Sequence, residues 1–440
     1  MSVALQPSTR RGYALGSVAT GTFGTVPGLL LLPYLTDTIG VAAALAGLIV
    51  VVPKLWDVLL DPVAGRISDR STHRDGPRRP FLIRAGLALA VCFALMFAGP
   101  TSPTTLGAAW VVVTFLLCAT AYSFFQVPFV AMPAEMTPDY AERTRIMTWR
   151  VVVLALAILL SGATAPVVVN AFGGEPTSRG YTVMGGYVAV VIALGTVGAW
   201  WGTRHAPRHH VRAATGTIVD QLRLVAAAPD FRALLATFVV QALGIGVMLA
   251  AVAYVANQLL DSPGAATFLF AAFVGPALLV TPLWERAFGQ RGKRAGYVAS
   301  SLFLVAGALG LLASLGAVTA VVYPAAALVG IGYAGAQVFP LAMLPDAAAH
   351  DAEVTGENRI GVYTGVWTAG ETLGLALGPG LFALILAIGG YVSSSAETTV
   401  AQPGSALTAI GVGFSLVPAV LIAVSLVFLR GYRLDERVTR

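Results

Sequence analysis

Apolar stretches long enough to cross a lipid bilayer recur along the whole of this chain of 440 residues. A transmembrane helix needs about 20 mostly apolar residues. Only 11% of the residues are charged, whereas a soluble domain has about 25%. The sequence therefore predicts an all-α membrane protein with twelve transmembrane helices. We expect these helices at residues 14–35, 41–65, 81–99, 105–131, 147–171, 181–202, 232–258, 265–285, 295–315, 319–343, 360–390 and 406–429.

Basic residues are distributed unevenly over this pattern of spans. The chain has 27 Lys and Arg, of which only Lys54 and Lys293 are lysine. All the basic clusters fall on one side of the twelve-span arrangement, and the opposite side carries Arg179 alone. Because loops rich in Lys and Arg stay in the cytoplasm, we expect a multi-pass protein of the inner (plasma) membrane with both termini cytoplasmic. The same bias accounts for the net charge of +6 without a nucleic-acid partner.

The longest connection between spans, 204–230, divides the chain into two halves. We expect an N-terminal six-helix bundle over 1–203, and a C-terminal six-helix bundle with a cytoplasmic tail over 231–440. A weak internal repeat supports this division, because a GRISDR segment follows the second span and an ERAFGQR segment follows the eighth. Two such bundles around a central cavity are the design expected for alternating access. The histidines of the connection have no nearby Cys or carboxylate, so we expect no metal site there.

Three carboxylic acids lie inside the apolar stretches: Asp57, Asp61 and Glu371. A charged side chain is costly in hydrocarbon and therefore marks a functional site by default. Asp57 and Asp61 are four residues apart and Lys54 precedes Asp57 by three, so a helix places all three on one face. Two carboxylates on adjacent turns can ligate a small hard cation or share a proton. Lys54 or Arg150 can neutralise them when the cation is absent, and a purely structural ion-pair network is the alternative.

Longer motifs carry a resemblance to a known family. They lie at 56–65 (WDVLLDPVAG), at 127–145 (VPF, then EMTPDYAERTR), at 343–346 (MLPD) and at 355–359 (TGENR). Together they resemble the glycoside–pentoside–hexuronide:cation symporter family of the major facilitator superfamily. The resemblance implies the major facilitator fold and a secondary active transporter, not an enzyme. It implies symport of a small solute such as a glycoside with H⁺ or Na⁺, and no other cofactor.

The resemblance also assigns roles to residues. Paired aspartates of the second span bind the coupling cation in this family, and they match Asp57 and Asp61. A third acidic residue, found in span four of a well-studied member, is replaced here by Gln126, which offers a neutral oxygen. This replacement favours H⁺ coupling, or no coupling, over Na⁺ coupling. The lysine common in span eleven is also missing, because the pair there reads Glu371-Thr372; Glu371 is expected to bind either substrate or protons.

The substrate site is expected near the membrane midplane between the two bundles of a monomer. Residues 16–33, where the family has a sugar-binding aspartate, contain no charge. This leaves an amphipathic or lipid-like solute, with H⁺ coupling or without Na⁺ coupling, as the alternative to a glycoside. The candidate cavity residues are Lys54, Tyr122, Trp149, Arg150, Gln337, Tyr363, Trp367, Glu371 and Thr372.

Mixed acidic and basic residues at the cytoplasmic loops form a separate group. We expect ion pairs among them to close the inner side of the outward-open state, because such networks bias a conformational equilibrium. The alternative is that the arginines only satisfy the insertion rule. The members of this expected gate are Asp69, Arg70, Asp139, Glu142, Arg143, Arg145 and Arg359.

Overall fold

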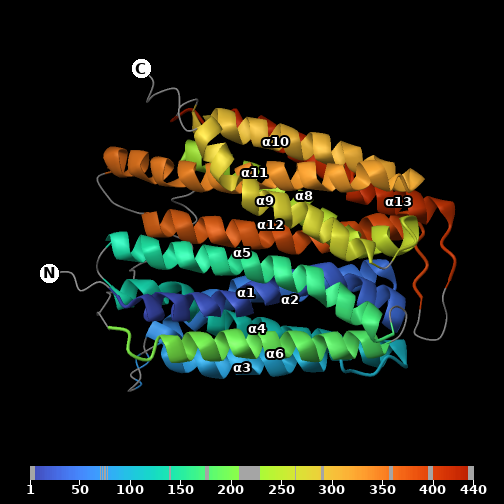
Figure 1. Ribbon diagram of the computed structural model, residues 1–440, viewed down its shortest axis with the longest axis horizontal. Coiled ribbons are helices and arrows are strands. Elements are labelled where there is room, and N and C mark those ends of the chain that lie inside the picture. The colour runs from blue at the N-terminus through green and yellow to red at the C-terminus, as the bar shows by residue number, and fades with distance from the viewer. Residues whose placement is uncertain are drawn as a thin grey trace. The chain divides into compact units, whose positions relative to one another are not determined.

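The computed structural model describes residues 5–69, 71, 73, 76, 78–137, 140–173, 178–207, 228–262, 264–288, 292–355, 360–394 and 400–434. All regular elements in these ranges are helices (Figure 1). The chain divides into two compact units. The first consists of Met1–Ala214 with Ser393–Ala401, and the second of Thr215–Val392 with Gln402–Arg440.

In the first unit, the helices lie alongside one another (Figure 1). Helix α1 packs against α5 and α6, α3 packs against α4 and α6, and α2 packs against α4. A π-helical turn, Tyr34–Ile39, continues α1. The helices of this unit are α1 (Pro7–Pro33), α2 (Ala43–Asp69), α3 (Arg79–Met96), α4 (Thr104–Met136), α5 (Tyr140–Ala171) and α6 (Ser178–Gly202).

In the second unit, α8 packs against α12 and α14, while α11 packs against α9 and α10. The last span is formed by two helices that meet at Ser415. Pro418 has no N–H to donate to the carbonyl of Phe414, which accounts for the break. The helices of this unit are α8 (Pro229–Tyr254, continued by a π-helical turn Val255–Leu259), α9 (Ala265–Phe288), α10 (Lys293–Gly310, continued by a 3₁₀ turn Leu311–Gly316), α11 (Thr319–Thr355), α12 (Ile360–Ile388), α13 (Gly404–Phe414) and α14 (Leu416–Leu429).

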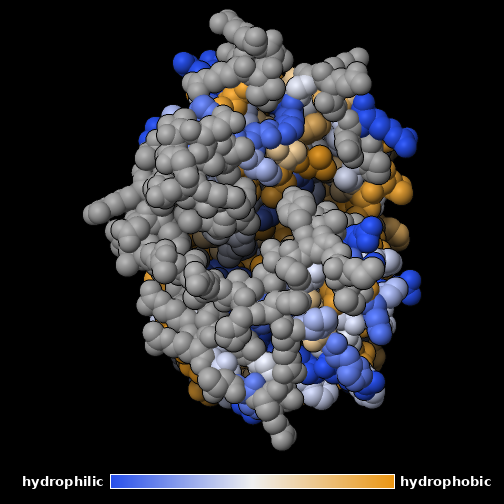
Figure 2. All heavy atoms as spheres, turned by 90° about the vertical axis from the view of Figure 1, so that its left-hand side faces the viewer, coloured by the Kyte–Doolittle hydropathy of each residue, from blue (hydrophilic) through white to orange (hydrophobic). Residues whose placement is uncertain are grey.

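Each of the twelve expected spans coincides with one of these helices, or with the pair α13 and α14 for the last one. Within the described ranges, eleven helical segments are long and apolar enough to cross a membrane, and the apolar part of α9, Ala265–Thr281, is shorter. The prediction of an all-helical membrane protein is confirmed. Figure 2 looks onto the end of the molecule from which α1 and α3 start; hydrophilic side chains gather on it and hydrophobic side chains line its flanks.

Glycines allow close helix contacts in both units. A Cβ added to Gly12 on α1 would lie 2.4 Å from the Cα of Gly202 on α6. A Cβ on Gly378 of α12 would lie 2.5 Å from the Cα of Gly246 on α8. Small residues let transmembrane backbones approach closely, which is the main source of packing energy between helices in lipid. Gly12 lies near the start of α1 and Gly202 is the last residue of α6, so their contact shows that α1 starts and α6 ends at the same end of the first unit.

Candidate functional site

Helix α2 places the charge cluster of Lys54, Asp57 and Asp61 on one face. Asp57 is buried, with 3% of its surface exposed, while Lys54 and Asp61 are half-buried. The Lys54 Nζ lies 3.9 Å from Asp57 Oδ2, one helical turn away. The ammonium therefore lies close enough to offset part of the negative charge of the two carboxylates.

Helix α4 supplies the polar partner of the two aspartates. Ser123 is buried, and its hydroxyl donates a hydrogen bond to Asp57 Oδ1 at 3.4 Å. Ser123 also interacts with the carboxyl group of Asp61. A second contact between the same helices, from Trp56 Nε1 to Thr120 Oγ1 at 3.1 Å, fixes the register of α2 against α4. Sequence reasoning missed Ser123, although its position three residues before Gln126 was an available signal.

Three aromatic rings surround the Lys54 ammonium, and we call Phe23, Phe115 and Tyr122 the aromatic cage. The Nζ lies 4.6 Å from the ring centroid of Phe23, and 5.8 Å from those of Phe115 and Tyr122. These distances are within the range of cation–π attraction, about 6 Å. Phe23 comes from α1 and the other two rings from α4. The ammonium is thus held between a carboxylate on one side and ring faces on the other.

The charge cluster has a simple electrostatic property. With both carboxylates and the ammonium ionised, it carries one net negative charge, so a single proton or monovalent cation neutralises it. The available oxygen atoms are hard donors of the kind that alkali and alkaline-earth cations prefer over sulfur or nitrogen. In the part of the chain that the structure describes, no three His, Cys, Asp or Glu residues are grouped as a metal site.

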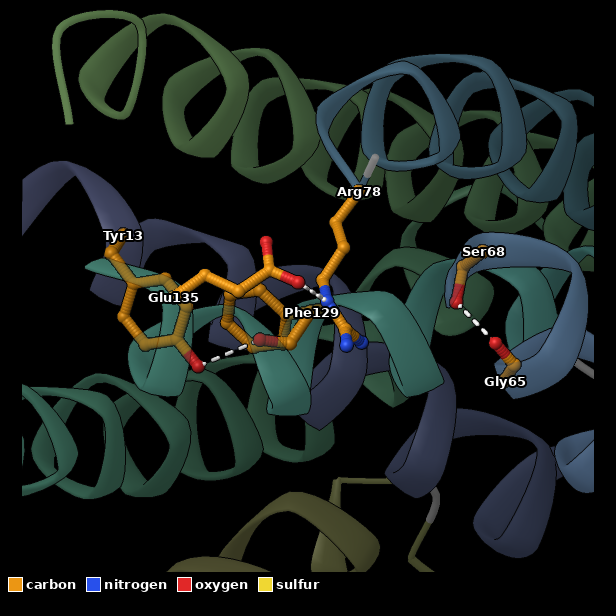
Figure 3. Close-up of polar contacts among 6 residues, drawn as sticks. All are labelled: Tyr13, Gly65, Ser68, Arg78, Phe129 and Glu135. Atoms are coloured by element: carbon orange, nitrogen blue, oxygen red, sulfur yellow. Dashed lines mark hydrogen bonds and ion pairs between the residues drawn. The ribbon is translucent and has the colours of Figure 1, made fainter. Parts of the chain in front are cut away.

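Gln126 lies one turn beyond Ser123 on α4, and its buried Oε1 has no hydrogen-bond partner among the described residues. Arg150 belongs to α5 and contacts an aromatic ring of α4. Its guanidinium carbon lies 5.7 Å from the ring centroid of Phe129. Tyr13 donates a hydrogen bond of 2.9 Å to the backbone carbonyl of Phe129 (Figure 3). Arg150 is therefore seated on the aromatic stack of α1 and α4.

Trp149 is 40% exposed, and the guanidinium carbon of Arg11 lies 5.5 Å from its ring centroid. Because Arg11 belongs to the first turns of α1, Trp149 contacts the same end of the unit at which the chain begins. The indole is thus engaged by an arginine of its own unit.

The remaining predicted cavity residues belong to the second unit. Gln337 and Glu371 line one pocket. Trp367 is buried and stacks on Phe238, with ring centroids 4.2 Å apart. Tyr363 is buried against Phe231, with centroids 4.5 Å apart. Thr372 is half-buried beside Glu371. Tyr363 and Trp367 are thus packed against aromatic rings, while Gln337 and Glu371 face an open space.

The expected gate residue Glu142 lies within a network of the first unit. Its Oε1 is 2.5 Å from Arg10 Nε, and its Oε2 is 3.5 Å from Arg145 Nη1. Arg70, Asp139 and Arg359 lie outside the described residues, as do the side chains of Asp69 and Arg143. The network of Glu142 joins α5 to α1, and therefore ties together helices of one unit.

A further ion pair of the first unit joins Arg78, just before α3, to Glu135 near the end of α4 (Figure 3). Nearby, the hydroxyl of Ser68 caps the end of α2 by donating to the carbonyl of Gly65 at 2.9 Å. Glu135 occurs in one of the sequence motifs of the resemblance, yet the pairing with Arg78 was not predicted. Their partners could not be read from the sequence, because 57 residues separate them.

Comparisons with known proteins agree with this geometry. A family model described as MFS/sugar transport protein matches residues 12–436. The putative glycoside/cation symporter YagG of Escherichia coli (strain K12) is 26% identical over 440 residues, covering 97% of this chain and 92% of the relative. The sodium-dependent lysophosphatidylcholine symporter 1 of Mus musculus is 24% identical over 370 residues, covering 76% and 68%.

A solved structure shows the same fold. It is that of a bacterial homologue of the human lysosomal transporter Spinster in an inward-facing, occupied conformation, with a TM-score of 0.69, 13% identity, and coverage of 98% of this chain and 96% of the other. The family match spans nearly the whole chain. This protein therefore belongs to the MFS/sugar transport family of secondary active transporters, which confirms the resemblance to glycoside–pentoside–hexuronide:cation symporters drawn from its motifs.

Proposed function

We propose that this protein moves its solute in symport with a cation that binds at Asp57 and Asp61. The observation that supports this is the charge balance of the buried cluster, which has two carboxylates, one ammonium 3.9 Å away, and a serine hydroxyl. Without the cation the cluster keeps one negative charge, and an uncompensated charge is costly in a low-dielectric environment. Binding of one cation removes that cost. Cation binding thus lowers the free energy of the states in which the cluster is not accessible to water.

Lys54 acts in this scheme as a tethered competitor of the coupling cation. In the empty protein the ammonium approaches Asp57 and offsets its charge. When the coupling cation neutralises the carboxylates, the ammonium loses that attraction but keeps the cation–π attraction of the aromatic cage. The side chain thus keeps a favourable place in the protein interior. This arrangement lets the protein return empty as well as loaded.

The coupling ion is H⁺ in our proposal, and Na⁺ is the alternative. Two carboxylates can share a proton, because like charges a few Å apart resist joint ionisation. The third position that the resemblance would fill with an acid is Gln126, which cannot add negative charge. A neutral oxygen such as the buried Gln126 Oε1 can still complete the coordination of Na⁺. An ion-replacement experiment distinguishes the two.

The solute we propose is a glycoside, which the family description and the name of the Escherichia coli relative support. An amphipathic lipid-like solute is the second candidate. It is favoured by α1, which has no charged residue from Gly16 to Pro33, and by the name of the mouse relative. We also propose that both termini are cytoplasmic, since the basic loops lie on their side.

The test is solute uptake into vesicles that contain the purified protein, driven by a pH gradient or by a Na⁺ gradient. A panel of radiolabelled methyl glycosides and a labelled lysophosphatidylcholine serve as probes. We expect accumulation of a glycoside under the pH gradient, and its loss in Asp57→Asn and in Asp61→Asn. Asp346→Asn, at a half-exposed ion pair of the second unit, is the matched control and should accumulate solute normally. Unchanged cation dependence in both cluster variants would show that these aspartates do not couple transport.

A further inference from the structure

A second group of polar side chains lies inside the second unit, away from the charge cluster. We call Gln241, Tyr333, Gln337 and Glu371 the polar pocket, because they line one space. They come from α8, α11 and α12, and apolar residues such as Phe238 complete the walls. Sites for small molecules in proteins combine apolar walls with a few polar groups. The polar pocket therefore has the composition of a ligand site.

Gln241 gives this pocket an acceptor that the protein itself does not use. The side chain is 3% exposed. Its Nε2 donates to Ser301 Oγ at 2.9 Å and to Ser425 Oγ at 3.1 Å. Its Oε1 is buried and has no hydrogen-bond partner among the described residues. A buried acceptor without a donor is unfavourable, and such groups in native proteins call for an explanation.

The orientation of this amide follows from its neighbours. The oxygen and nitrogen of an amide are distinguished only by their hydrogen-bond partners. Ser301 Oγ already donates to the carbonyl of Tyr297 at 2.8 Å, and Ser425 Oγ donates to the carbonyl of Ile422 at 2.6 Å. Both hydroxyl protons are thus engaged, and the two serines can only accept from Gln241. The nitrogen must face the serines, which leaves the oxygen for a donor from elsewhere.

The other polar members add a donor and further acceptors. Gln337 Nε2 donates to the hydroxyl of Tyr333 at 2.7 Å, so that hydroxyl keeps its own proton to donate. Glu371 lies on α12 within electrostatic reach of Tyr333. Phe238 is held in place by stacking on Trp367 at 4.2 Å. Carboxylate and amide oxygens, one phenol and an aromatic wall are the groups that a compact solute rich in hydroxyl groups requires.

We infer that the polar pocket binds the hydroxyl-bearing part of the transported solute, with one solute hydroxyl donating to Gln241 Oε1. This inference rests on the proposed transport of a glycoside and adds a subsite in the second unit to it. Glu371 accepts from a neighbouring hydroxyl, and Tyr333 donates to a solute oxygen. A sugar ring supplies several adjacent hydroxyl groups, whereas a lysophospholipid supplies a single one on its glycerol. A subsite that engages two neighbouring hydroxyls therefore selects a glycoside over an amphipathic lipid.

The test is a cycle that combines a protein variant with a changed solute. Purified wild-type protein and Gln241→Met are titrated calorimetrically with methyl glycosides and with the corresponding series of monodeoxy glycosides. We expect Gln241→Met to bind the parent glycoside at least ten-fold more weakly. One monodeoxy glycoside should bind the wild type more weakly than the parent glycoside by a similar factor. On the variant, the same monodeoxy glycoside and the parent glycoside should bind with almost equal affinity. This non-additivity identifies the hydroxyl that donates to Gln241.

Thr237→Val is the matched control, because Thr237 is also buried on α8 but donates to the carbonyl of Ala233 within its own helix. It should bind every glycoside like the wild type. Glu371→Gln, which preserves the side-chain shape, serves as a second variant if Gln241→Met does not fold. Its affinity loss should be non-additive with that of a different monodeoxy glycoside. Additive losses in the cycle, or equal affinities, would mean that the pocket holds only water and would overturn the inference.

Failure of the subsite and failure of the coupling scheme give different results. Suppose that proton-driven uptake disappears in Asp57→Asn, but the affinity losses from Gln241→Met and from the deoxy glycosides are additive. This result refutes the subsite and leaves the coupling scheme intact. Suppose instead that these affinity losses are non-additive, but uptake by the wild type does not depend on an ion gradient. This result supports the subsite and refutes the coupling. A wild type that binds lysophosphatidylcholine and no glycoside refutes the subsite.

Discussion

The two units build the same helix differently at the place where the charge cluster lies. The internal repeat aligns Gly65 on α2 with Glu285 on α9, and it therefore aligns Asp57 with Ala277 and Asp61 with Thr281. Helix α2 packs against α4 as α9 packs against α11, so the two helices occupy equivalent positions in their units.

The second unit shows that this helix position needs no charge in order to fold. On α9 the hydroxyl of Thr281 donates to the carbonyl of Ala277 at 2.7 Å. The polar side chain at these two positions is therefore hydrogen-bonded within its own helix. Replacing buried ion pairs by apolar packing is often neutral or stabilising. The carboxylates of α2 are therefore not explained by stability. Their presence in only one of two equivalent helices indicates a role in function.

The largest effect is expected from adding the missing charge to α9. Ala277→Asp places a carboxylate at a buried position that has no counterpart of the Lys54 ammonium on its own helix. A charged residue in the middle of a transmembrane helix costs about 3 kcal/mol by insertion measurements. We expect Ala277→Asp to lower the thermal unfolding temperature of the purified protein strongly, and Ala277→Asn to lower it less. Equal stability of Ala277→Asp and the wild type would show that the two units tolerate charge alike, and would remove the contrast on which the functional reading rests.

The next effect comes from the two lysines, because Lys54 and Lys293 are the only ones in the chain and one lies in each unit. Lys54→Met leaves two carboxylates without their ammonium, and breaking a buried pair typically costs about 3–5 kcal/mol. Because Lys54 is partly exposed, we expect a smaller penalty, seen as a fall of about ten-fold in net uptake, which corresponds to ~1.4 kcal/mol.

Solute exchange between loaded vesicles should persist in Lys54→Met, since exchange does not require the empty protein to return. Lys293→Met is the control, because Lys293 pairs with the half-exposed Asp346 and should keep both activities. If Lys54→Met lost exchange and net uptake equally, Lys54 would not serve as a substitute for the coupling cation.

A smaller effect is expected from the aromatic cage. Cation–π contacts contribute about 0.5–1 kcal/mol each at partly exposed sites. Phe23→Leu removes the nearest ring and should weaken the apparent affinity for the coupling cation by about three-fold, because the ammonium then depends more on the carboxylates that the cation must neutralise. Tyr122→Phe keeps its ring and should keep the affinity. The same substitution at Phe382 in the second unit, where the ring contacts Tyr254, should have no effect on the cation. Tighter cation binding in Phe23→Leu would contradict the cage.

The sequence could predict what depends on a single helix. The spans follow from runs of apolar residues, and the shared face of Lys54, Asp57 and Asp61 follows from helical periodicity alone. Their partners depend on which helices pack together and in what register. Ser123 lies 66 residues from Asp57, and no periodicity connects them. Phe23 could not be distinguished from the many aromatic residues that merely fill spans.

Two other residues show the same limit. The sequence offers Lys54 or Arg150 as the counter-charge of the aspartates and leaves both open. In the structure Lys54 lies 3.9 Å from Asp57 and Arg150 lies over Phe129, a contact set by the packing of α5 on α1 beside α4. Gln241 was not singled out at all, because its significance lies in two serine hydroxyls whose protons are already engaged by their own helices. Only packed side chains reveal an acceptor that has been left over.

The smallest effects are expected where the two units resemble each other most. Arg78 pairs with Glu135 between the start of α3 and the end of α4, and Lys293 pairs with Asp346 at 2.5 Å between the start of α10 and α11. The side chains of the first pair are 12% and 17% exposed, and those of the second pair are 40% and 42% exposed. Exposed ion pairs contribute about 0–1 kcal/mol and are screened by salt.

We therefore expect Asp346→Asn to lower the unfolding temperature by about 1–2 °C at low salt and by nothing measurable at about 1 M salt. Glu135→Gln should lower it more, and the difference should persist at high salt, because its partner Arg78 is left in a less exposed place and screening by ions is weaker there. Scanning calorimetry of both variants at two salt concentrations measures this. Equal and equally salt-sensitive shifts would indicate that burial does not distinguish the two pairs. The contrast between the two units would then rest on the charge cluster of α2.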